Sequence, residues 1–357
     1  MTIYQELQLN QAGSKKLVRD SVTVKEKIRH SMIYLLKIAV TLAFCVAFVG
    51  AFSILFGSEN SIVGVVVLLC VMVFRNADLG VSTGQSVGIL GLFFAVMIFG
   101  PQAAHHFGIF PGFLINAACI LLIMFLGCYN PLMSNQSTLV LGYLLLYGYE
   151  VSGNAYRMRM FALLIGALMT ILVFYRNHKK RVYKRQVKNI FEDFHFDSLR
   201  GRWQVCMSVS VPLVMMVSEY MKLPRSMWAG IAAMSVTALF LGDVKTKVKG
   251  RIIGNIGGAL CFLALYFILP EAIYSNIGII GGIGVGLSVS YGWQAVFNTF
   301  GALAVATEMF GLSSAVFLRI FQNVYGAVFA LILFAVFNWI VSRISEMRNS
   351  SSAVNCA

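Results

Sequence analysis

The sequence predicts an all-α, polytopic membrane protein of about twelve transmembrane helices. Of its 357 residues, 59% are hydrophobic and only 12% are charged, about half the charged fraction of a soluble domain. The apolar residues form long blocks instead of one stripe per helix, which is typical of segments that cross a bilayer. Most Lys and Arg residues lie between these blocks on one side, as a membrane topology requires.

Twelve apolar segments are expected to be helices, because none of them shows the alternation of barrel strands. Segments 61–74 and 138–149 fall short of the roughly 20 residues that a membrane-spanning helix needs. Either they extend beyond these limits, or they are short helices enclosed by the bundle. The segments are 32–56, 61–74, 81–99, 111–129, 138–149, 158–175, 203–221, 226–242, 251–268, 274–289, 292–308 and 314–342.

The basic residues predict the orientation. With these segments, 22 of the 28 Lys and Arg residues lie on the side of the N-terminus, three lie on the opposite side, and three lie within segments. The positive-inside rule then puts both termini in the cytoplasm, and the protein in the cytoplasmic (inner) membrane. This topology explains the net charge of +14, so we expect no nucleic-acid partner.

The two halves of the chain repeat short motifs. An arginine, Arg159 or Arg319, opens the last segment of each half and is followed by a Gly-Ala pair. Because each half holds six segments, both copies enter from the cytoplasm, and the repeat is parallel. Ladders of three glycines at helical spacing open the third and ninth segments: Gly80, Gly84 and Gly88, then Gly250, Gly254 and Gly258.

The repeat divides the chain into five parts. The linker between the halves starts with a basic run at Arg176 and continues with apolar residues at helical spacing from Val187 to Phe194. An amphipathic helix on the inner membrane surface, in contact with anionic lipids, fits both features. The alternative is a solvated basic loop that only fixes topology. The parts are an N-terminal cytoplasmic segment, the first six-helix repeat, the linker, the second six-helix repeat and a cytoplasmic tail, at 1–31, 32–175, 176–202, 203–342 and 343–357.

Two motifs of the second half resemble a known family. Leu223-Pro224-Arg225-Ser226-Met227-Trp228 begins the eighth segment, and Arg251-Ile252-Ile253-Gly254-Asn255-Ile256-Gly257-Gly258-Ala259 begins the ninth. They are similar to the "LPxxxW" helix and the "RxxGTxxGA" motif of the fusaric acid resistance and aromatic acid exporter (FUSC-like) family, whose distant relatives include plant aluminium-activated malate channels. Asn255 stands where the family usually has Thr. The likeness covers roughly 203–342 and weakens over 32–175, where the "RxxG" spacing is lost.

The resemblance implies export of organic or aromatic carboxylates, or at least anion permeation. Many members carry a large cytoplasmic domain, which the linker and the tail are too short to form. No GxSxG, HExxH or Walker sequence is present, so we expect no enzyme. The seven cysteines show neither a CxxC motif nor a histidine at ligand spacing, so we expect no metal and no cofactor.

Three arginines, with Asn255 beside the first, are the candidate substrate-binding residues. Arg251 lies at the predicted inner mouth, whereas Arg159 and Arg319 lie toward the outer ends of segments, where basic residues are scarce. A guanidinium offers five donors in a fork that matches a carboxylate. The alternatives are a topology charge at Arg251 and snorkelling at the other two.

Glu150 and Glu308 are the candidate proton-coupling residues. Each ends the segment before an arginine, so a short outer turn is expected to bring Glu150 near Arg159. A corresponding outer turn is expected to bring Glu308 near Arg319. If the carboxylate is protonated when the substrate binds the neighbouring arginine, proton movement and substrate movement are coupled. The alternative is two structural ion pairs.

The remaining polar residues have simpler explanations. Lys37 is expected to snorkel to the inner interface, and Asn298 and Thr299 are expected to hydrogen-bond between helices. His105 is expected in an outer loop. The glycine ladders either pack helices closely or line a narrow path.

Together these features predict secondary transport that exports organic, aromatic carboxylates, with proton coupling as an option. The path is expected between the two six-helix halves, and a homo-oligomer is a further expectation. One alternative is a passive organic-anion channel that uses the same arginines. The other alternative is a non-transporting membrane scaffold or partner subunit.

Overall fold

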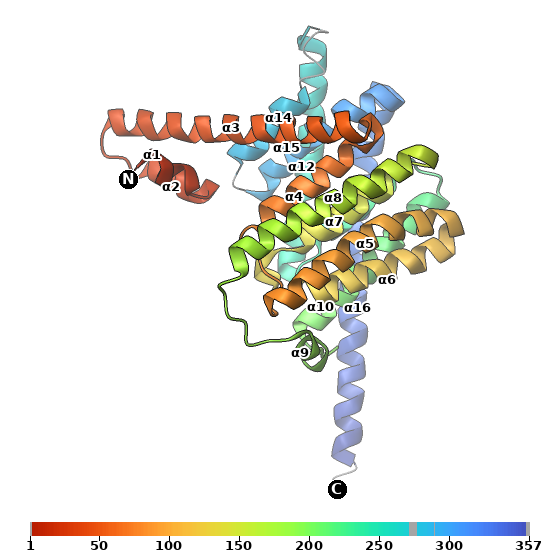
Figure 1. Ribbon diagram of the computed structural model, residues 1–357. Helices are drawn as coiled ribbons and strands as arrows, with labels where there is room; N and C mark the ends of the chain where they lie inside the picture. Colours follow the sequence, from red (N-terminus) through yellow and green to blue (C-terminus); the bar gives the residue numbers. More distant parts are fainter. Residues whose placement is uncertain (1, 271–276, 289, 355–357) are drawn as a thin grey trace. The chain divides into compact units, whose positions relative to one another are not determined.

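A computed structural model describes residues 2–270, 277–288 and 290–354 of the chain. The fold is 84% helical, and the described residues contain no strand. The all-α prediction is therefore confirmed (Figure 1).

The helices follow one another with short connections. Up to the linker they are α1 Ile3–Gln8, α2 Gln11–Arg19, α3 Val24–Phe56, η1 Ser58–Asn60, α4 Ser61–Phe74, α5 Thr83–Phe107, α6 Ile109–Gly127, η2 Pro131–Met133, α7 Gln136–Gly148 and α8 Gly153–His178. From the linker onward they are α9 Val187–Glu192, α10 Leu199–Tyr220, α11 Met227–Val236, α12 Leu241–Ile268, α14 Ile277–Leu287, α15 Tyr291–Phe310 and α16 Leu312–Val354.

Each of the twelve predicted segments contains a helix, although the ends of segment 274–289 lie outside the described residues. Segment 226–242 is longer than its helix, because α11 ends at Val236 and α12 begins at Leu241. Among the described residues, six helices are long and apolar enough to cross a membrane: α3, α5, α6, α8, α12 and α16. These helices support a multi-pass membrane protein. The count of twelve crossings and the parallel repeat stay predictions.

The chain forms two compact units that draw on both predicted halves. Unit 1 combines residues 1–47 with 249–321, and unit 2 combines residues 48–248 with 322–357. The helices α3, α12 and α16 each contribute to both units. The division into two repeats stays a prediction.

Unit 2 is a bundle around the two short helices α4 and α7. Val66 and Val67 of α4 and Tyr143 of α7 are fully buried, because α5, α8 and α11 pack around them. Segments 61–74 and 138–149 are therefore short helices enclosed by the bundle. On the outside, α8 exposes an apolar face at one-turn spacing, with Phe161 59% and Leu168 58% exposed. A face of this kind is suited to lipid.

In unit 2, loops that the predicted topology places on the cytoplasmic side of the membrane contact one another. Between α4 and α5, Asp78 lies 3.4 Å from Arg181 of the linker, and its carbonyl accepts a hydrogen bond from Asn135 Nδ2 at 3.1 Å. Arg185 of the linker stacks on Tyr129, which follows α6. The loops predicted to be cytoplasmic thus lie together in this unit.

The linker differs from a single helix on the membrane surface. The helix α8 continues to His178, and between it and α10 only the six residues of α9 are helical. Ile190 of α9 is 3% exposed, and the rings of Phe191 and Phe194 pack edge-on against Phe125 of α6. Ile190 thus packs on protein, whereas the Phe191 side chain remains 61% exposed. Contact of 176–202 with anionic lipids stays a prediction.

The two glycine ladders have different surroundings. In unit 1, a methyl group on Gly258 would lie 2.5 Å from the carbonyl oxygen of Val296, and one on Gly254 would lie 2.7 Å from that of Gly292. This ladder therefore packs α12 closely on α15. In unit 2, a methyl group on Gly84 or Gly88 would meet no described atom within 4 Å.

Gly80 plays a third role. It precedes α5 and has φ +75°, a backbone conformation that glycine adopts readily. The first ladder therefore consists of one turn glycine and two glycines on an open helix face.

Candidate functional sites

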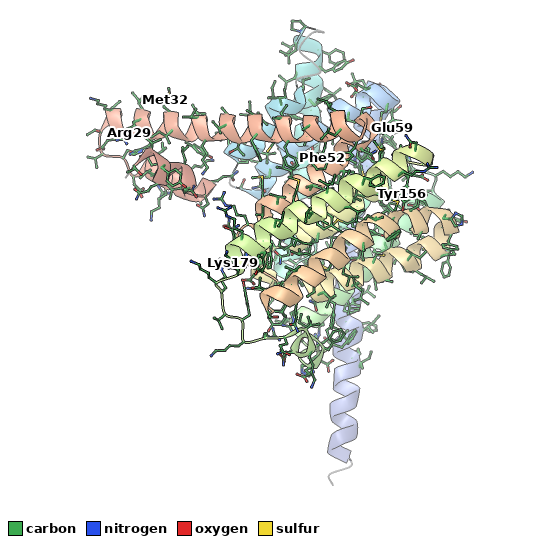
Figure 2. The ribbon with its side chains drawn as sticks, in the orientation of Figure 1. Arg29, Met32, Phe52, Glu59, Tyr156 and Lys179 are labelled. Atoms are coloured by element: carbon green, nitrogen blue, oxygen red, sulfur yellow. The ribbon has the colours of Figure 1, made fainter. Side chains whose placement is uncertain are left out.

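Arg159 lies buried near the start of α8, in unit 2, and is 5% exposed. Its guanidinium donates to the carbonyl oxygens of Tyr149 at 2.5 Å and Leu146 at 3.3 Å. It also donates to the Asn60 side chain at 3.0 Å and to the Glu59 carbonyl oxygen at 3.4 Å. Figure 2 labels Glu59 and Tyr156 in this region. The hydrogen bonds of the Arg159 guanidinium thus connect the end of α7 to η1. A role of Arg159 in substrate binding stays a prediction.

Glu150 contacts a histidine. Its Oε2 lies 3.9 Å from His105 Nδ1, and the ion pairs between described residues do not include one with Arg159. His105 is not a loop residue: it lies in the last turn of α5 and stacks on the Tyr147 ring at 4.1 Å. Its Nε2 also lies 2.9 Å from the Tyr147 carbonyl oxygen.

These residues line a polar cavity of about 510 Å³ in unit 2, here called the motif pocket. The Leu223–Ser226 part of the "LPxxxW" motif forms one wall, and the ends of α5, α7 and α10 form the others. Its charged and titratable residues are His105, Tyr147, Glu150, Glu219, Lys222 and Arg225.

Glu219 is held in place at the wall of the motif pocket. Its Oε1 accepts hydrogen bonds from the Tyr147 hydroxyl at 2.6 Å and the Ser226 hydroxyl at 2.8 Å. These two bonds join the ends of α7 and α10 to the start of α11. Arg225 donates to the Gly148 carbonyl oxygen at 2.6 Å and lies over the Tyr149 ring. The pocket thus combines two cations, two carboxylates and a histidine.

The second arginine motif lies in unit 1. Arg251 and Asn255 are buried, at 6% and 0% exposure. Asn255 donates to the Arg251 carbonyl oxygen at 2.9 Å and accepts from the Thr299 hydroxyl at 3.0 Å. The Thr299 bond joins α12 to α15, as expected for a hydrogen bond between helices. A substrate contact at Arg251 or Asn255 stays a prediction.

Arg319 and Glu308 lie at the outer side that the topology predicts for unit 1. Arg319 of α16 is 5% exposed, whereas Glu308 is exposed two residues before the end of α15. Their roles in substrate binding and proton coupling stay predictions.

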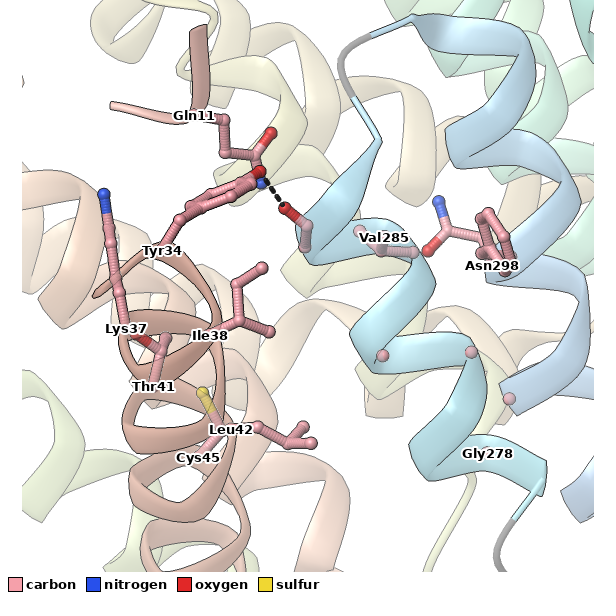
Figure 3. A pocket seen from close by; sticks show the side chains of 15 residues that line it. Gln11, Tyr34, Lys37, Ile38, Thr41, Leu42, Cys45, Gly278, Val285 and Asn298 are labelled. Carbon is pink, nitrogen blue, oxygen red and sulfur yellow. Dashed lines mark hydrogen bonds between the residues drawn. The ribbon is translucent and has the colours of Figure 1, made fainter. Parts of the chain in front are cut away.

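A second cavity, of about 480 Å³, lies in unit 1 between α3, α14 and α15 (Figure 3). We call it the glycine-walled pocket, because five glycines line it: Gly278, Gly281, Gly282, Gly286 and Gly301. Ile38, Leu42 and the Phe297 ring add apolar side chains. A flat apolar molecule can therefore approach the backbone of α14 and α15 closely.

Five polar side chains line the glycine-walled pocket: Gln11, Tyr34, Lys37, Thr41 and Asn298. The Tyr34 hydroxyl donates to the Gly286 carbonyl oxygen at 3.1 Å, which joins α3 to α14. The Lys37 ammonium donates to the Leu9 carbonyl oxygen and keeps two further N–H groups. Asn298 projects from α15, is exposed, and has no hydrogen-bond partner among the described residues. The pocket thus offers an amine, two amides and two hydroxyl groups among apolar side chains.

The sequence did not single out this pocket. Lys37 and Asn298 lie far apart in the chain, and each has a plausible separate role as a snorkelling cation or a helix–helix contact. The one available signal was their position inside apolar segments, where polar groups mark candidate functional sites.

Residues 213–333 match a family model described as "Fusaric acid resistance protein-like". The resemblance of the second half is therefore confirmed over this stretch, which includes the motif-pocket residues Glu219 to Ser226 and the Arg251, Asn255 and Arg319 positions. No curated protein and no solved structure matches the chain.

Proposed function

We propose that this chain exports organic carboxylates with an aromatic or other apolar body across the cytoplasmic membrane, and that the glycine-walled pocket receives the anion. The family match suggests a membrane efflux or transport role. The observation that carries the proposal further is that Lys37 and Asn298 line the same apolar pocket.

Electrostatics favours an anionic ligand in this pocket. Lys37 lies fourteen residues into α3, a candidate membrane span, where a charged group needs a partner or water. The pocket lining contains no acidic residue, so the neighbouring side chains leave the ammonium charge uncompensated. A carboxylate supplies the missing charge, while the ring of the ligand covers Ile38, Leu42 and the glycine backbone.

The motif pocket supports proton coupling. His105 and Glu150 are titratable groups in contact, and Lys222 and Arg225 face the same cavity. Protonation of Glu150 would leave more positive charge in the cavity and so favour an anion there. In this proposal the proton is exchanged at Glu150, and Glu308 provides the second coupling group that the repeat predicts.

The test is flux through the purified chain in liposomes. A panel of aromatic and aliphatic monocarboxylates is measured with and without a pH gradient. We expect aromatic acids to move faster than aliphatic acids of the same charge, and a proton gradient to drive them against their own gradient. We expect Glu150→Gln to remove the effect of the pH gradient.

The other outcomes separate the alternatives. Flux that only ever runs down the substrate gradient indicates a passive anion channel and contradicts secondary transport. An absence of flux for the whole panel, with a folded protein, contradicts the proposal and favours a scaffold or partner subunit.

A further inference from the structure

We propose that the junction of α2 and α3 binds the phosphate group of an anionic phospholipid. A cavity of about 490 Å³ lies at this junction, in unit 1. We call it the basic pocket, because its lining includes the three cations Lys15, Arg19 and Lys27. The other residues that line it are Val18, Ser31, Tyr34 and Leu35.

The basic pocket is held in shape by contacts behind it. Glu6 of α1 is 3% exposed, and its carboxylate lies 2.7 Å from His30 Nδ1 and 3.7 Å from Arg29 Nη2, both on α3. The Lys37 ammonium binds the Leu9 carbonyl oxygen between α1 and α2. Two separate contacts thus fix the α1–α2 hairpin to α3.

The positive charges in the basic pocket favour the binding of an anion. Its lining contains no acidic residue. Lys15 and Lys27 form no ion pair with a described residue, and the pair of Arg19 with Asp20 has side chains 77% and 49% exposed, so it contributes little. Three cations around one cavity repel one another, and a bound phosphate removes that repulsion.

The surroundings favour a lipid over a soluble anion. Lys27 lies in the first turn of α3, a 33-residue candidate membrane span. The next turns expose Ile28, Met32 and Leu35 at 59%, 64% and 52% (Figure 2 labels Met32). A phospholipid whose headgroup lies at Lys27 therefore has its acyl chains beside these apolar side chains. Ser31 adds a hydroxyl donor to the lining of the basic pocket.

The test measures binding and does not depend on transport. The thermal unfolding of the purified chain in detergent is followed while dioctanoyl phosphatidylglycerol is added. Dioctanoyl phosphatidylcholine and inorganic phosphate are the comparison probes. The test variant carries Lys15→Gln, Arg19→Gln and Lys27→Gln. The control variant carries Lys16→Gln, Lys25→Gln and Lys180→Gln, which remove the same charge outside the pocket.

We expect phosphatidylglycerol to raise the unfolding temperature of the native and control chains, and the other probes to have little effect. Each basic residue at an anionic surface contributes about fivefold in affinity, so the test variant loses roughly 100-fold. Equal losses in both variants would show a diffuse charge effect and overturn the site. An equal effect of inorganic phosphate would replace the lipid with a soluble anion. If the native chain does not respond to phosphatidylglycerol, the site does not exist, whatever the flux assays show.

Discussion

A single guanidinium, that of Arg159, joins separate parts of unit 2. It donates to oxygens of Leu146, Tyr149, Glu59 and Asn60, which belong to α7, the turn after it and η1. Its partners are carbonyl and amide oxygens, so the interaction is a set of charge-assisted hydrogen bonds. This environment explains why an arginine, rather than a lysine, occupies the start of α8.

Replacement of Arg159 by lysine is expected to destabilise the protein. A lysine has three donors on one atom and cannot reproduce the fork, so buried carbonyl groups lose their partners. We expect Arg159→Lys to lower the free energy of unfolding by about 2–4 kcal/mol. Thermal unfolding in detergent measures this, and Arg157→Lys, at an exposed position two residues before Arg159, serves as the control. If Arg159→Lys kept full stability but lost substrate binding, the arginine would act on substrate instead.

The surroundings of individual polar residues could not be predicted from local sequence. Arg159 and the Glu150 expected beside it do not form an ion pair, because Glu150 contacts His105 and the arginine binds carbonyl groups. The hydrogen bond from Thr299 to Asn255 was expected only as a general helix contact. Hydropathy indicates that a polar residue lies in a membrane helix, but the partner depends on which helices pack together.

Among the helices, the two glycine ladders show how one pattern serves different purposes. The spacing of four residues puts small side chains on one face in both cases. In α12 this face touches α15, whereas in α5 it faces no described atom within 4 Å. The same sequence pattern therefore predicts opposite responses to substitution.

Alanine substitutions distinguish the two ladders. We expect Gly258→Ala to destabilise the fold by about 1–3 kcal/mol, because its methyl group meets the Val296 backbone. We expect Gly88→Ala to be neutral or to stabilise by about 0.5–1 kcal/mol, because alanine is the better helix former. Thermal unfolding of both variants in detergent is the measurement. A destabilising Gly88→Ala would show that another chain covers this face of α5.

Helix positions were largely predictable, and helix ends were not. Each apolar segment proved to be a helix, because hydropathy alone sets where a chain can cross a bilayer. The end of α5 was placed at residue 99, yet the helix continues through Pro101 to Phe107. His105 was therefore assigned to a loop, although it lies on the helix and stacks on Tyr147. Polar residues at a helix end look like loop residues when only hydropathy is considered.

For the whole molecule, the distribution of charge predicts a topology that can be tested directly. The excess of Lys and Arg predicts that the N-terminus, the linker and the C-terminus lie on the cytoplasmic side. We expect single cysteines at positions 16, 180 and 348, in a chain without its native cysteines, to react with an impermeant thiol reagent only from that side. Positions 150 and 222 should react only from the other side. Labelling of 16 and 180 from opposite sides would contradict an even number of crossings in the first half.

The proposed transport depends on anion binding in the glycine-walled pocket, so the most direct measurement is the flux of an aromatic monocarboxylate through variants of that pocket in liposomes. We expect Lys37→Gln to reduce flux at least tenfold, because it removes the only charged group among the residues lining the pocket. We expect Asn298→Ala to raise the KM with less effect on the maximal rate. The controls are Lys180→Gln and Asn177→Ala, which alter exposed residues near the end of α8 and should transport as the native chain does. Native flux in a folded Lys37→Gln, Asn298→Ala double variant would contradict the account.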